Sequence, residues 1–339
     1  MSVEIYGTLG PACADAATLA QMIDAGMTGI RLNLSHMTLR EAQPYLDAVR
    51  AAERESGRSI GLLLDMQGPE LRVGRIREPM VLEEGARVVL GEGGIPLPEE
   101  ALCAVTKGQV ILLDDGKLRL RAESANCALV ERRGVLRSRK SAALPGVDVW
   151  LPVMTAQDRE NLALAPSCGV TAVMQPFVRS ADDLKAVRAA MNECGGTDIR
   201  LFAKIENRRG MDALPELLPN ADEIVIARGD LGNAMPLWEL PRAQAKIVAK
   251  CTAAQREFML STQMLHSMHH SAVPTRAEVT DVYQAAKSGA SYLLLTGETA
   301  VGEYPVEAMH YFAKIAHNGW EDADEMDRET KKSGIGRCP

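Results

Sequence analysis

Aromatic residues are scarce in this chain, at 4% of its 339 residues, and no apolar run is long enough to span a bilayer. So few aromatic side chains argue against base-stacking platforms for nucleic acid. The formal net charge of -7 gives no support for a polyanionic partner. The N-terminal segment MSVEIYGTLG lacks a basic stretch followed by an apolar one, so we expect no signal peptide. Neither a nucleic-acid partner nor a membrane is therefore expected.

Disulfide and zinc-binding patterns are also missing. The seven cysteines are odd in number, scattered along the chain, and contain no CxxC pair. This spacing argues against a disulfide framework or a zinc site and favours reduced thiols. We therefore expect a cytoplasmic protein.

The chain is rich in short apolar strands that alternate with helical segments. Eight such runs lack polar alternation, as parallel strands covered by helices do. They are residues 3–9, 28–32, 59–64, 170–174, 200–204, 222–227, 258–261 and 292–295. Helical periodicity lies between them, clearest over residues 18–25, 38–55 and 181–191. The pattern predicts an α/β fold, a (β/α)8 TIM barrel.

One interval breaks this alternation, between about residues 68 and 145. There Asp114-Asp115-Gly116-Lys117 separates two apolar runs, which predicts a β-hairpin. Pro69 and Pro145-Gly146 mark the ends of the interval. We therefore predict a barrel domain of residues 1–68 and 146–320, a small β-rich, barrel-like insert of residues 69–145 after strand three, and a polar tail of residues 321–339.

Charged side chains follow several of the predicted strands, and in such a barrel they would meet at one mouth. Arg31 and Arg72 could hold a phosphate, and Lys204 could neutralise developing negative charge. Glu206 and Asp230 offer two carboxylates to a hard cation such as Mg²⁺, which also takes substrate oxygens and waters. This set suits phosphoryl transfer, where positioning and charge neutralisation dominate.

Each motif taken alone also has a purely structural explanation. A Lys-x-Glu pair is usually solvated, and Arg228-Gly229-Asp230 could be a turn with a helix cap. Gly229 could equally leave backbone N–H groups open to an anion where a helix begins. Only the occurrence of all these motifs at successive strand ends favours a shared site.

The motifs occur in an order that resembles the pyruvate kinase family. The matching blocks are GTLGPA (7–12), GMTGIRLNLSH (26–36), LLLDMQGPELRVG (62–74), DDGKLRL (114–120), ALPG (143–146), KIENRRG (204–210), IVIARGDLG (224–232), STQMLHSM (261–268), PTRAE (274–278) and LLLTGETAVGEYPVEA (293–308). They cover nearly the whole chain.

This resemblance implies transfer of a phosphoryl group from phosphoenolpyruvate to ADP, giving pyruvate and ATP, a step of glycolysis. It implies Mg²⁺ or Mn²⁺ and K⁺ as cofactors. By this resemblance Lys204 and Arg31, supported by Arg72, would act on the transferred group, and Glu206 and Asp230 would bind the divalent metal. The substrate carboxylate would be bound by Gly229, Asp230 and Thr262, with Thr262 also near the proton route. The K⁺ ligands would be Asn33, Ser35, Asp65 and Met66, with Glu70 marking K⁺ dependence, and the nucleotide would be contacted by Thr8, His36 and Lys140. The insert would close over the mouth as a lid that excludes water.

The chain also departs from the family pattern. Gln67, Pro176 and Ala143 replace a Lys, a Ser and an Asn. The insert is shorter, and the C-terminal regulatory domain is not in this sequence, so control by sugar-phosphate effectors is not expected. Two alternatives stay open: a lyase or aldolase that acts on pyruvate enolate in the same metal site, and a weakly catalytic paralogue that senses phosphoenolpyruvate. An oligomer formed through the barrel is compatible with each.

Overall fold

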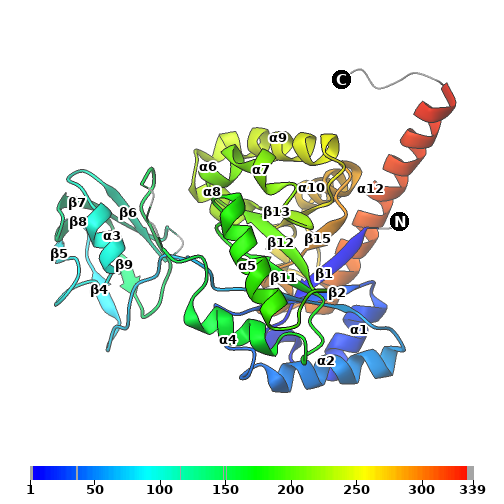
Figure 1. Cartoon of the computed structure of the whole chain (residues 1–339), viewed down its shortest axis with the longest axis horizontal. Helices are drawn as coiled ribbons and strands as arrows, with labels where there is room; N and C mark the ends of the chain where they lie inside the picture. The colour runs from blue at the N-terminus through cyan, green and yellow to red at the C-terminus, as the bar shows by residue number, and fades with distance from the viewer. Residues whose placement is uncertain (1–2, 36, 115, 148, 150, 334–339) are drawn as a thin grey trace. The chain divides into compact units, whose positions relative to one another are not determined.

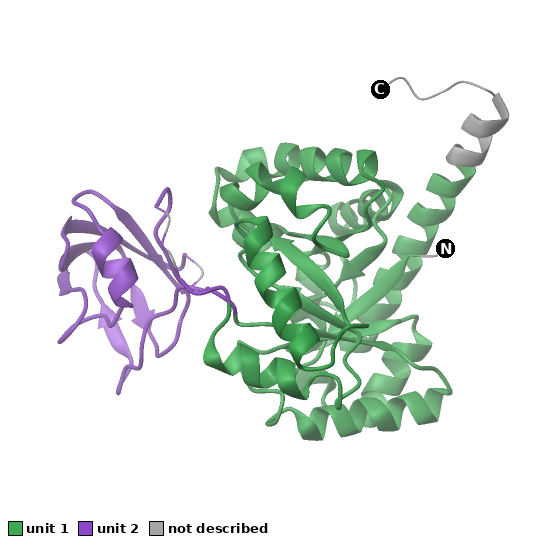
Figure 2. Cartoon of the chain, in the orientation of Figure 1, with its two compact units in different colours: residues 1–67, 154–339 green, residues 68–153 purple. Residues whose placement is uncertain are grey.

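A computed structural model describes residues 3–35, 37–114, 116–147, 149 and 151–333, the last eight by backbone alone (Figure 1). The chain divides into two units (Figure 2). The barrel unit comprises residues 1–67 and 154–339, and the insert comprises residues 68–153. Within the described residues, no helix is long and apolar enough to cross a membrane.

Eight parallel strands close into a barrel, as the sequence predicts. They are β1 (Glu4–Thr8), β2 (Gly29–Asn33), β3 (Gly61–Asp65), β11 (Ala172–Gln175), β12 (Arg200–Ile205), β13 (Glu223–Ala227), β14 (Phe258–Ser261) and β15 (Tyr292–Leu294). Around the barrel the order is β1-β15-β14-β13-β12-β11-β3-β2, with every neighbouring pair parallel. All the carboxyl ends therefore meet at one face, which confirms the predicted (β/α)8 barrel.

Helices cover the outside of these strands. They are α1 (Ala16–Asp24), α2 (Gln43–Ser56), α4 (Ala156–Leu164), α5 (Ala181–Glu193), α6 (Arg208–Asp212), α7 (Leu214–Leu217), α8 (Arg228–Asn233), α9 (Leu240–Ala253), α10 (Arg276–Lys287), α11 (Gly297–Ala300) and α12 (Pro305–Ser333). Helix α5 begins as predicted, because the Ser180 side chain accepts a hydrogen bond from the Asp183 N–H.

Two predicted helix boundaries need correction. Helix α2 begins at Gln43 and not at Thr38: Thr38 and Glu41 form the reciprocal bonds of a capping box in a preceding turn, but Pro44 has no N–H to continue the helical hydrogen bonds from that turn. Helix α12 continues through Ser333, so residues 321–333 of the expected polar tail are helical. Gly319 allows α12 to approach α10 closely, because a Cβ there would overlap the Tyr283 backbone.

The interior of the barrel is filled by aromatic and aliphatic side chains. Tyr292 packs edge-to-face against Tyr6 and against Phe202, with ring centroids 5.7 and 5.5 Å away. A Cβ at Gly29 would overlap the Tyr6 ring, and one at Gly61 would lie 2.5 Å from the Tyr6 hydroxyl. Glycine on two neighbouring strands therefore makes room for the Tyr6 ring. We call Tyr6, Phe202 and Tyr292 together the aromatic floor.

The insert is built from β-strands around its own core. Its elements are β4 (Met80–Leu82), β5 (Arg87–Val89), α3 (Glu99–Ala104), β6 (Val110–Leu113), β7 (Leu118–Ser124), β8 (Cys127–Arg132), β9 (Gly134–Leu136) and β10 (Ala142–Ala143). Five strands form a sheet in the order β10-β6-β7-β8-β5, and β4 pairs with β9. The predicted hairpin joins β6 to β7 with Leu113 opposite Leu118; Asp115 lies outside the described residues. The insert extends eight residues beyond its predicted end at Pro145.

Candidate active site

Four charged side chains form a chain of ion pairs at the carboxyl ends of three barrel strands. Arg31 on β2 contacts Asp65 on β3, with Nη2 to Oδ2 at 2.6 Å and Nε to the same oxygen at 2.8 Å. Lys204 on β12 lies with Nζ 3.3 Å from Asp65 Oδ2 and 2.9 Å from Glu206 Oε1. All four side chains are at most 13% exposed. The structure thus brings together four residues that the sequence placed at three separate strand ends.

The pKa values in this cluster follow from burial and from the neighbouring charges. Burial alone would lower the pKa of Lys204, but the carboxylates of Asp65 and Glu206 outweigh it and raise that pKa. Burial opposes ionisation of Asp65, yet Lys204 and Arg31 hold its pKa below the ordinary range. Lys204 is therefore a permanent cation at neutral pH, suited to stabilise negative charge and unsuited to act as a base.

Glu206 is the carboxylate of the cluster whose charge is least compensated. Burial, with a smaller contribution from the nearby Asp230, raises the pKa of Glu206 to about 7, although Lys204 opposes the shift. Oε2 accepts the N–H of Phe177 at 2.8 Å, whereas Oε1 is buried and, in the described part of the chain, accepts no hydrogen bond beyond its ion pair. Phe177 adopts a φ of +52°, which is strained for a bulky side chain.

The pair Glu206 and Asp230 fits a hard divalent cation. A cation between two carboxylates would relieve their mutual repulsion and satisfy the buried Oε1 atom. In the described residues no group of three or more His, Cys, Asp or Glu is placed to hold a metal. Two protein carboxylates are a typical set for Mg²⁺, which keeps waters and substrate oxygens as its other ligands.

A strained turn after β14 forms the next part of the mouth. Thr262 and Gln263 have φ values of +77° and +54°, both in the left-handed region. Arg228 at the start of α8 holds this turn, with Nη2 2.9 Å from the Thr262 carbonyl oxygen and Nη1 2.7 Å from Asp281 Oδ2. A Cβ at Gly229 would lie 2.9 Å from Thr262 Cγ2, so glycine is needed for this close contact.

Sequence reasoning missed the residues that hold this turn and Glu206. Arg228 is visible within the motif ARGDLG, but the sequence gives no sign that its side chain reaches the turn after the next strand. Its partner Asp281 lies on α10, 53 residues away. Phe177 acts through its backbone N–H, which no side-chain motif reveals.

The predicted K⁺ ligands lie at the ends of neighbouring strands. Asn33 and Asp65 are register partners on β2 and β3, and the Asn33 side chain accepts the N–H of Ser35 at 3.1 Å. Met66 directly follows Asp65 and is buried. Asp65 is at the same time ion-paired with arginine and lysine. A role of these four residues in K⁺ binding stays a prediction.

The remaining candidates are partly engaged in other contacts. The buried Thr8 hydroxyl donates to the Leu295 carbonyl at 2.8 Å and accepts from Arg31 Nη1 at 3.2 Å. Three candidates belong to the insert: Arg72 pairs with Glu70 at 2.6 Å, and Lys140 pairs with Asp114 at 2.9 Å. His36 lies outside the described residues. Their roles toward phosphate, K⁺ and nucleotide stay predictions.

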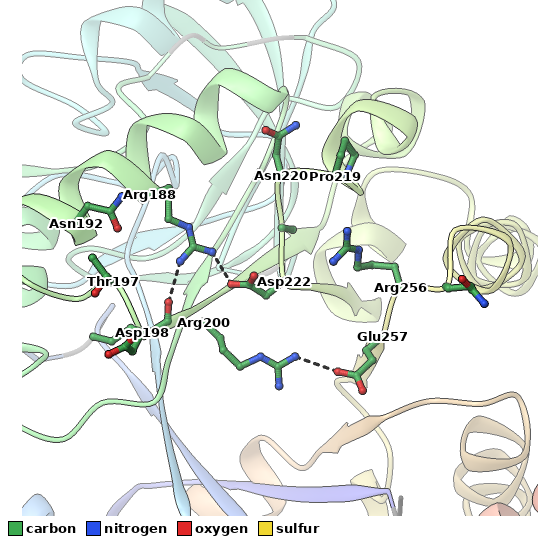
Figure 3. A pocket seen from close by; sticks show the side chains of 13 residues that line it. Arg188, Asn192, Thr197, Asp198, Arg200, Pro219, Asn220, Asp222, Arg256 and Glu257 are labelled. Atoms are coloured by element: carbon green, nitrogen blue, oxygen red, sulfur yellow. Dashed lines mark hydrogen bonds and ion pairs between the residues drawn. The ribbon is translucent and has the colours of Figure 1, made fainter.

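A cavity of about 950 Å³ lies at the other face of the barrel, at the amino ends of β12, β13 and β14 (Figure 3). Two of its arginines face carboxylates, Arg188 with Asp222 at 2.5 Å and Arg200 with Glu257 at 3.0 Å. In barrels of this kind the active site lies at the carboxyl ends of the strands, whereas the residues at the amino ends contribute to stability. The candidate active site is therefore the mouth with Lys204, although this cavity is larger than the other pockets described.

The fold and this site define a (β/α)8-barrel protein with two cationic side chains and two carboxylates largely buried at its mouth. The family model described as "Pyruvate kinase, barrel domain" matches residues 1–309. The chain belongs to the pyruvate kinase family, a family of phosphotransferases, which confirms the resemblance seen in the sequence.

Individual relatives agree with the family match. A pyruvate kinase of Aeropyrum pernix is 38% identical over 326 residues, which are 94% of this chain and 71% of that protein. Pyruvate kinases of Sporosarcina psychrophila and Geobacillus stearothermophilus are 36% and 34% identical over 92% and 97% of this chain. This chain spans only 56% and 59% of those two proteins.

Proposed function

We propose that this protein transfers the phosphoryl group of phosphoenolpyruvate to ADP, giving pyruvate and ATP. The observation that carries the proposal is the Lys204 ammonium group, fixed between Asp65 and Glu206 in a buried cluster that also contains Arg31. A reaction that produces an enolate needs a fixed cation where that negative charge develops. Family membership supports the same reaction.

Three residues of the mouth would have separate tasks in this reaction. Arg31, held by Asp65, would grip the transferred phosphoryl group as the bond to the enol oxygen breaks and the bond to a β-phosphate oxygen of ADP forms. Lys204 would neutralise the enolate oxygen that is left behind. Thr262, which lies close to Gly229 at the start of α8, would help to hold the substrate carboxylate, and the enolate carbon would take up its proton on that side. That proton completes pyruvate.

Metal ions complete the proposed mechanism. Glu206 and Asp230 would hold Mg²⁺ or Mn²⁺, which supplies charge neutralisation to the phosphoryl oxygens. Asn33, Ser35, Asp65 and the Met66 carbonyl would form the K⁺ site, with Glu70 as the sign of K⁺ dependence. Support comes from the register of Asn33 with Asp65.

We further propose that the insert is a lid for this mouth and that Arg72 and Lys140 in it, with Thr8 and His36 in the barrel unit, contact phosphate or nucleotide. We also propose a role in glycolysis and a cytoplasmic location. The scattered cysteines, of which six are described as free thiols, support a reducing compartment. Association of copies through the barrel is compatible with these proposals.

Coupled measurement of pyruvate formation from phosphoenolpyruvate and ADP tests the reaction. We expect turnover that requires Mg²⁺ or Mn²⁺ and rises with K⁺. The variant Lys204→Met should lose most of it, whereas Lys185→Met, which removes an exposed lysine of α5, should keep it. Exchange of the pyruvate methyl protons without any response to ADP or ATP would instead support a lyase or aldolase.

A further inference from the structure

Both connections between the barrel unit and the insert are bonded to one carboxylate at the start of α4. The chain leaves the barrel unit after Gln67 and returns at Met154. Asp158 is fully buried, and its Oδ1 accepts the N–H of Gln67 at 2.9 Å. Its Oδ2 accepts the N–H and the hydroxyl of Thr155, each at 2.8 Å. We call this arrangement the Asp158 clamp.

The clamp does more than cap a helix. A capping box needs only the reciprocal bonds between Thr155 and Asp158, which begin α4. The bond to Gln67 is additional and joins segments 91 residues apart. Helix α5 offers a comparison, because Asp183 is also buried at the third helical position but accepts the N–H of Arg179, only four residues away.

A second buried side chain on α4 fixes the clamp to the rest of the barrel unit. Asn161, one turn after Asp158, accepts the N–H of Leu39 at 2.9 Å, from the segment that follows β2. Buried hydrogen bonds of this kind are costly to break, because a freed backbone N–H would be left without water. The start of α4 is therefore a rigid base for both connections, and the freedom to pivot begins beyond Gln67 and before Thr155.

We propose that Asp158 is a positioning residue that sets the two pivots of the insert and thereby limits its movement as a lid. This proposal rests on the proposed function only in treating the insert as a lid. The outgoing pivot is Gly68, which has a φ of +57° and can change its backbone angles more easily than other residues. With one carboxylate bonded to both connections, the two pivots are kept side by side and a single hinge results.

Hydrogen exchange of the chain of residues 1–339, followed by mass spectrometry, tests the clamp without any need for activity. In Asp158→Asn one acceptor oxygen becomes an amide donor, so the side chain cannot serve both connections. Because asparagine keeps one acceptor oxygen, we expect exchange to become about tenfold faster in the peptide that contains Gln67 or in the one that contains Thr155, the effect of losing one buried hydrogen bond. The matched control Asp183→Asn should accelerate exchange at the start of α5 and leave both connections unchanged.

A second variant separates the helix cap from the two connections and also covers failure of Asp158→Asn to fold. Thr155→Val removes the hydroxyl that accepts the Asp158 N–H but keeps the N–H bonds from Gln67 and Thr155 to Asp158, so only the Asp158 N–H at the start of α4 should exchange faster. Faster exchange of the Gln67 N–H in Thr155→Val would overturn the clamp, because it would show that this N–H is protected by the helix cap and not by Asp158 Oδ1. The same conclusion follows if Asp158→Asn affects the two connections no more than Asp183→Asn does.

Kinetics then link the clamp to the reaction. We expect kcat to fall and KM for phosphoenolpyruvate to rise together in Asp158→Asn, because lid movement affects both, and neither to change in Asp183→Asn. Equal effects of the two variants on kcat and KM would overturn the positioning role. If the wild-type protein shows no turnover, the proposed function fails, whereas the exchange measurements still decide whether the clamp exists.

Discussion

Replacement of Lys204 by methionine is the most direct test of the proposed mechanism, because it removes the charge and nearly keeps the volume. Loss of one fixed electrostatic group from an active site typically costs about 2.7–4 kcal/mol of transition-state stabilisation, or roughly 10²–10³ in kcat. Lys204 lies 2.9 Å from Glu206 and 3.3 Å from Asp65 and is 13% exposed, so water cannot replace its charge. We therefore expect kcat to fall by about this factor.

The stability of Lys204→Met can be worked out from the partners that remain. Breaking a buried ion pair by removing one partner costs about 3–5 kcal/mol of the free energy of unfolding. Here Asp65 keeps Arg31 at 2.6 Å. Glu206 already has a pKa of about 7 and can take up a proton at neutral pH. Both factors place the expected loss near the lower end, about 3 kcal/mol.

Two measurements separate these effects. Steady-state pyruvate formation gives kcat, and denaturant unfolding at the same pH gives the free energy of unfolding. Lys204→Arg is a useful companion, because it keeps the charge but not the compact ammonium geometry and should recover little activity. A folded Lys204→Met protein whose kcat lies within about threefold of wild type would refute the role of Lys204, since an effect on transition-state charge must exceed that.

Three further predictions concern the mouth and the amino end of the barrel. Gly229→Ala places a methyl group 2.9 Å from Thr262 Cγ2, so kcat/KM should fall about 10²-fold with unfolding nearly unchanged; normal kinetics would contradict the tight contact. Arg228→Lys cannot hold both the Thr262 carbonyl and Asp281, so kcat should fall about tenfold, and full activity would show that the turn needs no support. Burial raises the pKa of Glu223 to about 9 from an ordinary 4.5, so the folded state binds the Glu223 proton more tightly than the unfolded state does. The contribution of this proton to the free energy of unfolding is complete below about pH 4.5 and is lost as pH rises toward 9. In Glu223→Gln the free energy of unfolding, measured with denaturant from pH 5 to 9, should lose this decline, and an unchanged pH profile would refute the assignment.

The fold was predictable because each barrel strand is a short apolar run, and each predicted run contains or overlaps an observed strand. For the site, the sequence predicted which residues lie at the strand ends but not which of them contact one another. The pairing of Asp65 with both Arg31 and Lys204 depends on strand register and barrel closure, which local sequence does not encode. Capping signals located α5 correctly at Ser180 but placed the start of α2 too early at Thr38, because a turn uses the same residues.

The longest-range interactions were outside the reach of sequence reasoning. The hydrogen bond from Gln67 to Asp158 joins one residue that precedes the insert in the sequence to one that follows it. The contact of Arg228 with Asp281 likewise spans several elements of the barrel unit. Neither pair forms a local motif, so each needed the assembled barrel to become visible.

The aromatic floor determines whether small molecules can pass along the barrel axis. Tyr6, Phe202 and Tyr292 fill the bore of the barrel, and the Arg200 guanidinium lies 5.4 Å from the Phe202 ring centroid. A packed bore offers no passage for water or protons along the barrel axis. In the proposed reaction, substrates and products would then enter and leave through the mouth alone, so closure of the mouth would be sufficient to isolate the site from solvent.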